Sequence, residues 1–321
     1  MKRPISLAGR RAILAGLFLL TGCGWGQNSA ADYTIGIIGS SPSLEQALGE
    51  AGYPIQQISY QDFADGSVTV HQISCLVFVS SERFPYSGRN CLMQFLRDGG
   101  DLITMGGYAF KTPVYAHRGK LYSQNELLRT LVEDATDRHI VIDFSQADLS
   151  GWSRDCDNIK SPSTLSKVNK EGFECAQMDI RNFSRWDTFR GPFVSQPGQN
   201  ALTLRIKGSD NLRKVVVEIR ESDGSRWVAA ADLSTQWQDI VILQTDFQFL
   251  PDGSPSGRGK SGDILSLDRA AYLQMGMSYD YSAHKIGDYQ IWIQQAGTAR
   301  VQTPEGFGLP LFDKMLPIFS D

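Results

Sequence analysis

The residues of this chain with the clearest capacity for chemistry are polar and aromatic side chains that alternate with apolar ones in short β-type runs. Successive side chains of a β-strand point to opposite faces of its sheet. In the run 272–279 the apolar residues Leu273, Met275 and Met277 are expected to face the core, which leaves their neighbours on the outer side. The same alternation in other runs predicts one outer face that carries Arg205, Glu218, Arg220, Gln274, Gln290 and Trp292.

A face of this composition has the chemistry to bind sugars. A pyranose ring presents apolar C–H groups that stack on an indole, and its hydroxyls pair with planar amide, guanidinium and carboxylate groups. Two predicted loops add rim residues, the first with Arg185, Trp186 and Arg190 and the second with Asp280, Tyr281 and His284. In the alternative interpretation, the face is only the solvated side of a sandwich and the tryptophan packs under a loop. The candidate ligand-binding residues are Trp292, Gln290, Gln274, Arg205, Arg220, Glu218, Trp186, Arg190 and Tyr281.

A set of short strands must position these side chains. From His139 onward, β-rich runs are separated by polar loops, and about seven runs with turn signals between them favour an antiparallel β-sandwich. The expected strands are 140–144, 201–206, 214–220, 226–231, 239–243, 272–279 and 288–294.

Three segments of this region resemble galactose-binding-like jelly-roll domains, which include several carbohydrate-binding modules. They are 143–152 (DFSQADLSGW), 237–243 (WQDIVIL) followed by Phe247, and 287–293 (GDYQIWI). The resemblance implies a jelly-roll domain over 138–300 that binds carbohydrate. Many relatives have an acidic pair late in the last strand, next to a structural calcium ion. This chain has Gln294 and Gln295 there, which argues against a structural calcium ion but leaves it as an alternative, and no other cofactor or metal is expected.

The first half of the chain has a different pattern of apolar and polar residues. Strand-like runs at 33–38, 55–58, 75–80 and 101–105 alternate with helical patterns at 44–48 and 89–96, and 124–133 is also helical. This order predicts a small parallel α/β domain over 33–136.

The stretch 96–108 (LRDGGDLITMGGY) resembles the class I glutamine-amidotransferase-like fold, in particular variants related to trehalose-utilisation proteins. The resemblance implies a flavodoxin-like parallel sheet. In catalytic members the strand leads into a G-x-C-x-G turn that exposes a cysteine nucleophile. Here Met105, Gly106 and Gly107 offer no nucleophile, and Cys75 and Cys91 lie elsewhere in the sequence. We therefore expect no catalysis by this domain.

The cysteines and histidines are predicted to have structural roles and not to form a metal site. Cys156 and Cys175 flank a polar stretch and are predicted as a disulfide pair, which would stabilise by roughly 3 kcal/mol. Cys75 and Cys91 are expected to be free thiols beyond disulfide reach. The four histidines are scattered and no C-x-x-C pair is present, so a zinc site is not expected.

The N-terminus has the pattern of an export signal. Basic residues precede an apolar run, 12–20, which is about half the roughly 20 residues that a membrane-spanning helix needs. The run ends in Leu20-Thr21-Gly22-Cys23, which resembles a bacterial lipobox. The resemblance implies removal of 1–22 and attachment of acyl chains to Cys23, which would hold the mature protein on a membrane. Gly24 replaces the aspartate that retains some lipoproteins on an inner membrane, which favours the outer one.

Removal of this leader leaves 27 basic and 35 acidic residues, a formal net charge of −8. Such a surface repels nucleic acid. A short polar tether, 23–32, is expected before the first domain, and the Pro- and Gly-containing segment 301–321 is expected to be a connector or docking tail.

Three functions remain open on the sequence alone. The first is a membrane-anchored lipoprotein that binds carbohydrate without catalysis. The second is a structural or assembly lipoprotein of the cell envelope that binds proteins. The third is a carbohydrate-active hydrolase, since two placed carboxylates suffice for glycoside hydrolysis, although no motif selects a pair among the 35 acidic residues.

Overall fold

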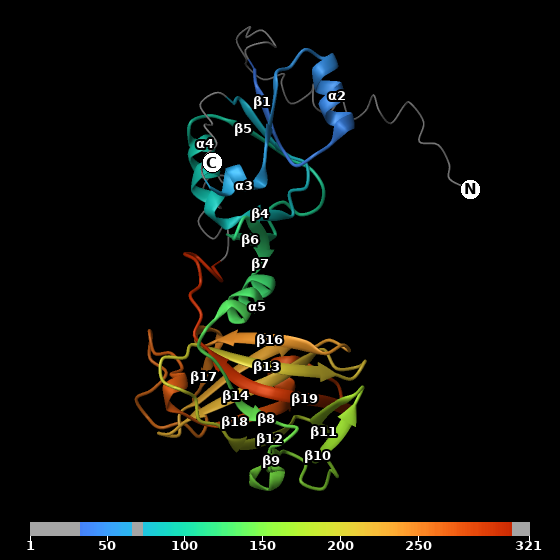
Figure 1. Cartoon of the computed structure of the whole chain (residues 1–321), viewed down its shortest axis with the longest axis vertical. Helices are drawn as coiled ribbons and strands as arrows, with labels where there is room; N and C mark the ends of the chain where they lie inside the picture. The colour runs from blue at the N-terminus through green and yellow to red at the C-terminus, as the bar shows by residue number, and fades with distance from the viewer. Residues whose placement is uncertain (1–32, 66–72, 310–321) are drawn as a thin grey trace, which may run out of the picture. The chain divides into compact units, whose positions relative to one another are not determined.

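A computed structural model describes residues 33–65 and 73–309, which fall into two compact units (Figure 1). The first unit contains the chain up to Gln124 and from Gly306 onward, and the second contains Asn125–Glu305. The boundary therefore falls after the first residue of the helix Gln124–Asp134, which the sequence assigned to the first domain. Cys23 and its lipobox lie outside the described residues, and so does the tail from residue 310. In the described part of the chain, no helix has the length and apolarity needed to cross a bilayer.

The first unit is built on a four-stranded parallel sheet in the order β2-β1-β3-β5. The four predicted strands and their parallel arrangement are confirmed. The packing of Phe63, Phe78 and Phe84, with ring centroids 5.6–5.7 Å apart, forms the centre of its core. The strands are β1 (Ile35–Ile38), β2 (Ile55–Ile58), β3 (Cys75–Phe78) and β5 (Asp101–Thr104), and the helices are α2 (Pro42–Glu50), α3 (Tyr60–Ala64) and α4 (Arg89–Arg97).

The glycine pair after β5 forms a tight turn. Gly106 and Gly107 have φ values of +78° and +84°, a region that L side chains rarely adopt, and a Cβ on Gly106 would lie 3.3 Å from the Val79 carbonyl oxygen. Cys75 lies at the opposite end of β3 from this turn, and Cys91 lies in α4. Burial raises the pKa of the Cys75 thiol to about 12.

A second, three-stranded sheet of the first unit was not predicted. It joins β4 (Arg83–Pro85), β6 (Thr112–His117) and β7 (Lys120–Ser123), which are short and carry many polar residues. The start of the C-terminal tail packs on this sheet. The ring centroid of Phe307 lies 4.9 Å from that of Tyr115, and the Gly308 N–H donates to the Tyr115 hydroxyl at 3.2 Å.

The second unit holds helix α5 (Gln124–Asp134), of which all but the first residue belongs to it, and two six-stranded sheets, which we name by their central strands. The β19 sheet has the order β10-β11-β19-β13-β16, with β8 also paired to β19, and the β18 sheet has the order β17-β15-β14-β18-β12-β9. The strands are β8 (Arg138–Asp143), β9 (Ser153–Cys156), β10 (Thr164–Lys170), β11 (Phe173–Phe183), β12 (Trp186–Pro192), β13 (Ala201–Gly208), β14 (Lys214–Glu221), β15 (Arg226–Asp232), β16 (Gln238–Leu243), β17 (Gln248–Leu250), β18 (Ala270–Ser278) and β19 (Gly287–Ala299).

The two sheets enclose one apolar core, so the antiparallel β-sandwich is confirmed. Buried residues from both sheets meet in it, among them Leu204 and Ile291 from the β19 sheet and Val217 and Met275 from the β18 sheet. The seven predicted strands are present. Five others, β9 to β12 and β17, were missed, and the polar stretch before Cys175 that we took for a loop contains β10.

The predicted disulfide is wrong, because Cys156 and Cys175 are both free. Cys156 ends β9 in the β18 sheet, whereas Cys175 lies in β11 of the β19 sheet, so the two residues belong to different layers. Cys75 and Cys91 are also free, as predicted.

Candidate functional site

A row of polar side chains crosses the outer face of the β18 sheet. Strand register places Glu218 of β14 opposite Gln274 of β18, and Gln274 opposite Arg190 of β12. All three face away from the core because their neighbours along each strand, such as Leu273 and Ile219, are buried inside. Three residues of the candidate set, drawn from strands far apart in sequence, therefore meet on adjacent strands.

Two exposed aromatic rings lie on the two sides of this row, displaced from it along the strand direction. Trp186 is 36% exposed at the start of β12, and Tyr272 is 45% exposed near the start of β18. Tyr272 is in register with Pro192, six residues beyond Trp186 on β12, so the rings are separated by ~20 Å along the strand direction. The polar row lies between the two rings.

The centre of the face has polar atoms without partners. Gln274 Nε2 donates to Thr188 Oγ1 at 2.7 Å and lies 3.4 Å from Asp155 Oδ2. Its Oε1, like Nε of Arg220, is buried and has no partner among the described residues. A buried polar atom without a partner costs about 1–3 kcal/mol, and both atoms have almost no exposed surface. A donor and an acceptor from a ligand would offset this cost once neighbouring side chains move to admit them.

Glu218 is held by two arginines. Arg226 Nε and Nη2 donate to its two carboxylate oxygens at 2.7 and 2.9 Å, and Arg220 Nη2 lies 3.6 Å from one of them. The hydrogen bond to Glu218 raises the pKa of Arg226. The bidentate geometry fixes the carboxylate and leaves Arg220 with unused N–H donors.

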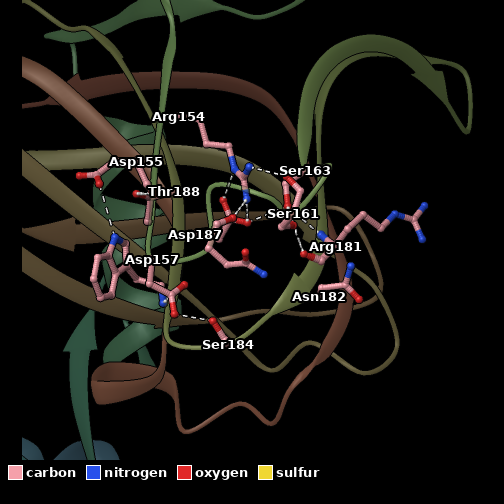
Figure 2. Close-up of polar contacts among 12 residues, drawn as sticks. Arg154, Asp155, Asp157, Ser161, Ser163, Arg181, Asn182, Ser184, Asp187 and Thr188 are labelled. Carbon is pink, nitrogen blue, oxygen red and sulfur yellow. Dashed lines mark hydrogen bonds and ion pairs between the residues drawn. The ribbon is translucent and has the colours of Figure 1, made fainter.

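A buried ion pair supports the Trp186 end from the core side (Figure 2). Asp187 is 2% exposed and accepts from Arg154 Nε at 2.8 Å, from Arg154 Nη2 at 2.6 Å and from Ser163 Oγ at 2.7 Å. Arg154 Nη1 also donates to the Ser161 carbonyl oxygen at 2.7 Å. These contacts hold β9 against β12 and tie the 158–163 segment to them.

The ion pair therefore positions residues on the outer face. Since Asp187 faces inward, its neighbours Trp186 and Thr188 face outward. Asp155 of β9 is in register with Thr188, and its carboxylate lies 3.4 Å from the Trp186 indole nitrogen. Figure 2 shows Asp155 and Thr188 side by side, with Asp157 below them next to Ser184.

Tyr281 lies in α6 (Tyr279–Ser282), at the border of the same face. Burial raises the pKa of its hydroxyl, and the nearby carboxylates of Asp280 and Glu218 raise it further. Tyr281 therefore joins the group around Glu218. His284, from the same predicted loop, is buried, and its Nε2 accepts from the Arg213 N–H at 3.0 Å.

The prediction of a single outer face is wrong, because the candidate residues divide between the two sheets. Trp186, Arg190, Glu218, Arg220, Gln274 and Tyr281 belong to the β18 sheet or its border, whereas Arg205, Gln290 and Trp292 belong to the β19 sheet. The predicted loop around Arg185 is also wrong, because Trp186 and Arg190 lie in strand β12.

Trp292 faces outward as predicted but is covered. It is only 5% exposed, its Nε1 donates to Gln177 Oε1 at 2.9 Å, and Lys170 Nζ lies 4.4 Å from the ring centroid. Lys207 Nζ lies 5.9 Å from the same centroid and pairs with Glu171 at the β10–β11 turn. The interpretation that an outward tryptophan packs under a loop is therefore the correct one for Trp292.

The other two candidates on the β19 sheet are bonded to neighbours. Gln290 Nε2 donates to Asp179 Oδ1 at 3.2 Å, while Arg205 donates to Gln294 at 2.9 Å and to Asp239 at 3.0 Å. Arg205 also lines a small cavity of about 30 Å³ between α5 and this sheet. Because the hydrogen bonds of Arg205 and Gln290 are made within the protein, the β19 sheet is the weaker candidate.

Sequence reasoning missed three residues of the β18 face. Tyr272 and Arg226 were assigned to strands but not to the site, and Asp155 lies on β9, which was not predicted. The alternation around Leu273 was a usable signal for Tyr272. Nothing in the sequence indicated that Asp155 and Gln274 come together.

In the described ranges, 33–65 and 73–309, no group of three or more His, Cys, Asp or Glu side chains could hold a metal ion. No family model and no curated protein matches the chain.

Several solved structures resemble about half of the chain. One is a family 11 carbohydrate-binding module from Clostridium thermocellum in complex with a β-1,3-1,4-mixed-linked tetrasaccharide, at 15% identity and a TM-score of 0.41, covering 53% of this chain and 99% of that one. Another is a putative sugar-binding protein from Bacteroides thetaiotaomicron, at 11% identity and a TM-score of 0.32, covering 52% and 96%. An agarase matches at 11% identity and a TM-score of 0.34, covering 53% and 25%. At these values the similarity fixes neither a ligand nor a binding residue of this chain.

Proposed function

We propose that this protein binds carbohydrate without catalysis through the outer face of its β18 sheet, and that it is held on a membrane by acyl chains on Cys23. The observation that carries the binding proposal is the pairing of two exposed rings, Trp186 and Tyr272, with two buried polar atoms that lack partners, Gln274 Oε1 and Arg220 Nε.

The chemistry of each part suits a sugar chain. Trp186 and Tyr272 provide apolar surfaces for the C–H faces of pyranose rings. A sugar hydroxyl can both donate and accept, so hydroxyls between the rings would donate to Gln274 Oε1 and accept from Arg220. The separation of ~20 Å between the rings along the strands suits an extended oligosaccharide that runs along β12 and β18.

The anchor proposal rests on the lipobox resemblance at Leu20–Cys23 and on the export pattern before it. It places the mature protein on a membrane outside the cytoplasm, with the outer membrane favoured by Gly24. A tethered protein with an open sugar-binding face would capture or retain polysaccharide near the cell surface.

Affinity electrophoresis of the full chain in detergent, through gels that contain neutral and acidic polysaccharides, tests the binding proposal. At least one polysaccharide should retard the protein, and Trp186→Ala should weaken its apparent Kd at least tenfold. Trp292→Ala is the matched control, because its ring is covered by Lys170 and should not contact sugar. The face is wrongly assigned if Trp186→Ala has no effect, or if Trp292→Ala weakens binding equally while the protein stays folded.

The anchor is tested separately by mass spectrometry of the N-terminal peptide. We expect a mature chain that begins at an acylated Cys23, and a Cys23→Ser variant that is neither acylated nor retained in the membrane fraction. A wild-type chain with an unmodified Cys23 would remove the anchor and leave the binding proposal standing.

A further inference from the structure

The Tyr272 end of the β18 face has an unusual arrangement of arginines. Arg220 of β14 is in register with Tyr272, and the guanidinium carbon of Arg190, from β12 on the other side, lies 5.6 Å from the Tyr272 ring centroid. An exposed aromatic ring therefore lies between two cations that approach it from neighbouring strands.

Neither arginine has a carboxylate of its own in the described part of the chain. Arg220 Nη2 lies 3.6 Å from the Glu218 carboxylate, but Arg226 already binds both oxygens of that carboxylate. Arg190 makes no ion pair with any described residue. Two carboxylates, Glu218 and Asp252, thus lie beside three arginines, the second of them 4.0 Å from Arg226 Nη1. This corner therefore carries a net positive charge at neutral pH.

The arrangement also costs stability. Arg220 and Arg226 are directly opposite each other in register, and like charges at opposed positions destabilise a sheet. Nε of Arg220 is buried without an acceptor. Natural sequences tend to retain such local costs at functional sites, where a ligand offsets them.

The Trp186 end has the opposite character. Asp155 lies 3.4 Å from the Trp186 indole nitrogen, and Asp157 lies 3.4 Å from its backbone nitrogen. Trp186 and Tyr272 are ~20 Å apart along the strands, whereas the Asp155 carboxylate also lies 3.4 Å from Gln274 Nε2 in the middle of the face. The acidic and basic groups are therefore offset along the strands without being fully screened from each other.

We propose that the Tyr272 corner binds an anionic substituent, a carboxylate or a sulfate group, on the pyranose that stacks on Tyr272. This inference rests on the proposed function and narrows it to acidic polysaccharides. A carboxylate or sulfate accepts charge-assisted hydrogen bonds from a guanidinium, and it supplies the acceptor that Arg220 Nε lacks. The Arg190 guanidinium lies beside Tyr272 on the β12 side and can donate to the same anionic group.

The test compares each acidic polymer with its neutralised partner in affinity electrophoresis of the full chain. The first pair is polygalacturonate and its fully methyl-esterified form, and the second is a sulfated galactan and its desulfated form. The acidic member of at least one pair should bind at least tenfold more tightly, and this preference should shrink as salt is added. The pair that responds identifies the anion as carboxylate or sulfate.

Arg190→Gln should remove most of the preference for the acidic partner. Arg220→Gln should do the same and should also weaken binding of the neutral partner, because the proposed site uses Arg220 as a donor to sugar hydroxyls. The matched control is Arg185→Gln, because Arg185 also lies over an aromatic ring, 5.9 Å from the Trp186 centroid, but at the acidic end. It should leave the preference unchanged. Arg220→Lys retains the positive charge but lacks the planar guanidinium, so it should lose part of the preference for the acidic partner. This variant tests the role of Arg220 in anion binding if Arg220→Gln is unstable.

The outcomes separate the two proposals. Equal binding of acidic and neutral partners, with Arg190→Gln without effect, would overturn this inference and leave carbohydrate binding in place. A chain that no polysaccharide retards would overturn the proposed function and this inference with it.

Discussion

The sandwich has two outer faces that carry similar residue types and differ in how those residues are used. On the β19 sheet, Trp292 is covered by lysines and Gln290 and Arg205 are bonded to neighbours. On the β18 sheet, Trp186 and Tyr272 remain exposed, and the polar atoms between them include two without partners.

The difference teaches that an outward side chain is not necessarily an accessible one. Alternation along β19 correctly places Trp292 away from the core. The β10–β11 turn, more than 100 residues earlier in the chain, then brings Lys170 and Glu171 over that side. Such coverings reduce the surface that is left for binding. The β18 sheet keeps two exposed rings on its polar face, Trp186 and Tyr272, whereas the β19 sheet keeps one, Phe173, with the Arg205 guanidinium 5.6 Å from its ring centroid.

The largest expected effect is on the free energy of unfolding, which should fall much more in Trp292→Ala than in Trp186→Ala. Trp292→Ala removes a buried indole, so it should lower the free energy of unfolding of the second unit by about 3 kcal/mol. Trp186→Ala removes a partly exposed ring and should cost less than about 1 kcal/mol. Urea unfolding followed by tryptophan fluorescence measures both, because the described tryptophans all lie in the second unit. Equal losses would contradict the contrast between a covered and an open face.

The next effect concerns the ion pair beneath the Trp186 end. Asp187→Ala leaves the Arg154 guanidinium partly buried without its carboxylate, and should lower the free energy of unfolding by about 2–3 kcal/mol. It should also weaken sugar binding, since Trp186 and Thr188 flank Asp187. Asp280→Ala is the control: it breaks an exposed pair with Arg185 at 3.8 Å, where we expect less than about 1 kcal/mol. A similar loss from both variants would show that burial of the pair is unimportant.

The sequence was most informative where apolar and polar residues alternate along a strand. Leu202, Leu204 and Ile206 of β13, and Val215, Val217 and Ile219 of β14, follow the period of two, and both strands were predicted with their inward faces correct. In the first unit a different signal identified the four parallel strands, since three of them contain runs of consecutive apolar residues.

The missed strands fall into two kinds. β10 is an edge strand whose residues are exposed or half-buried, so it has no apolar face to detect. β11 does alternate, with Ala176, Met178 and Ile180 buried, and this signal was available but was obscured by the expectation of a disulfide loop.

The prediction that all candidate residues share one outer face failed for a different reason. Period two assigns each strand an inside and an outside, but it does not say which sheet a strand joins. Strands β13 and β14 are consecutive in the predicted list, yet β13 pairs with β19 and β14 with β18. Their outer faces therefore lie on opposite sides of the sandwich, and Arg205 is separated from Arg220.

A smaller effect tests the covering of Trp292. Glu171→Ala removes the carboxylate that pairs with the buried ammonium of Lys207, and should cost roughly 1–2 kcal/mol in urea unfolding. Glu171→Gln keeps an acceptor for the ammonium and should cost less. Neither variant should change polysaccharide retardation. Acquired sugar binding in Glu171→Ala would instead show that the β19 face becomes a site once it is uncovered.

The smallest expected effect is a pH dependence on the β19 side. Asp288 accepts from the Asn182 N–H at 2.8 Å and pairs with Arg181 at 3.2 Å, and these contacts lower the pKa of its carboxyl. A carboxyl whose folded pKa lies below its unfolded value contributes stability above the unfolded pKa, 3.8 for this group, and the contribution is lost as the pH falls through the folded value.

Asp288→Asn should therefore be less stable than the wild type near neutral pH. The difference should vanish in strong acid, where the Asp288 carboxyl of the wild type is protonated in both the folded and the unfolded state. Urea midpoints measured at a series of pH values check the sign. Since Asp288 is exposed and lies on the face to which we assign no ligand, polysaccharide binding should not change with this variant. A loss of binding in Asp288→Asn would mean that the β19 side contributes to the site, and the division between the two faces would then have to be redrawn.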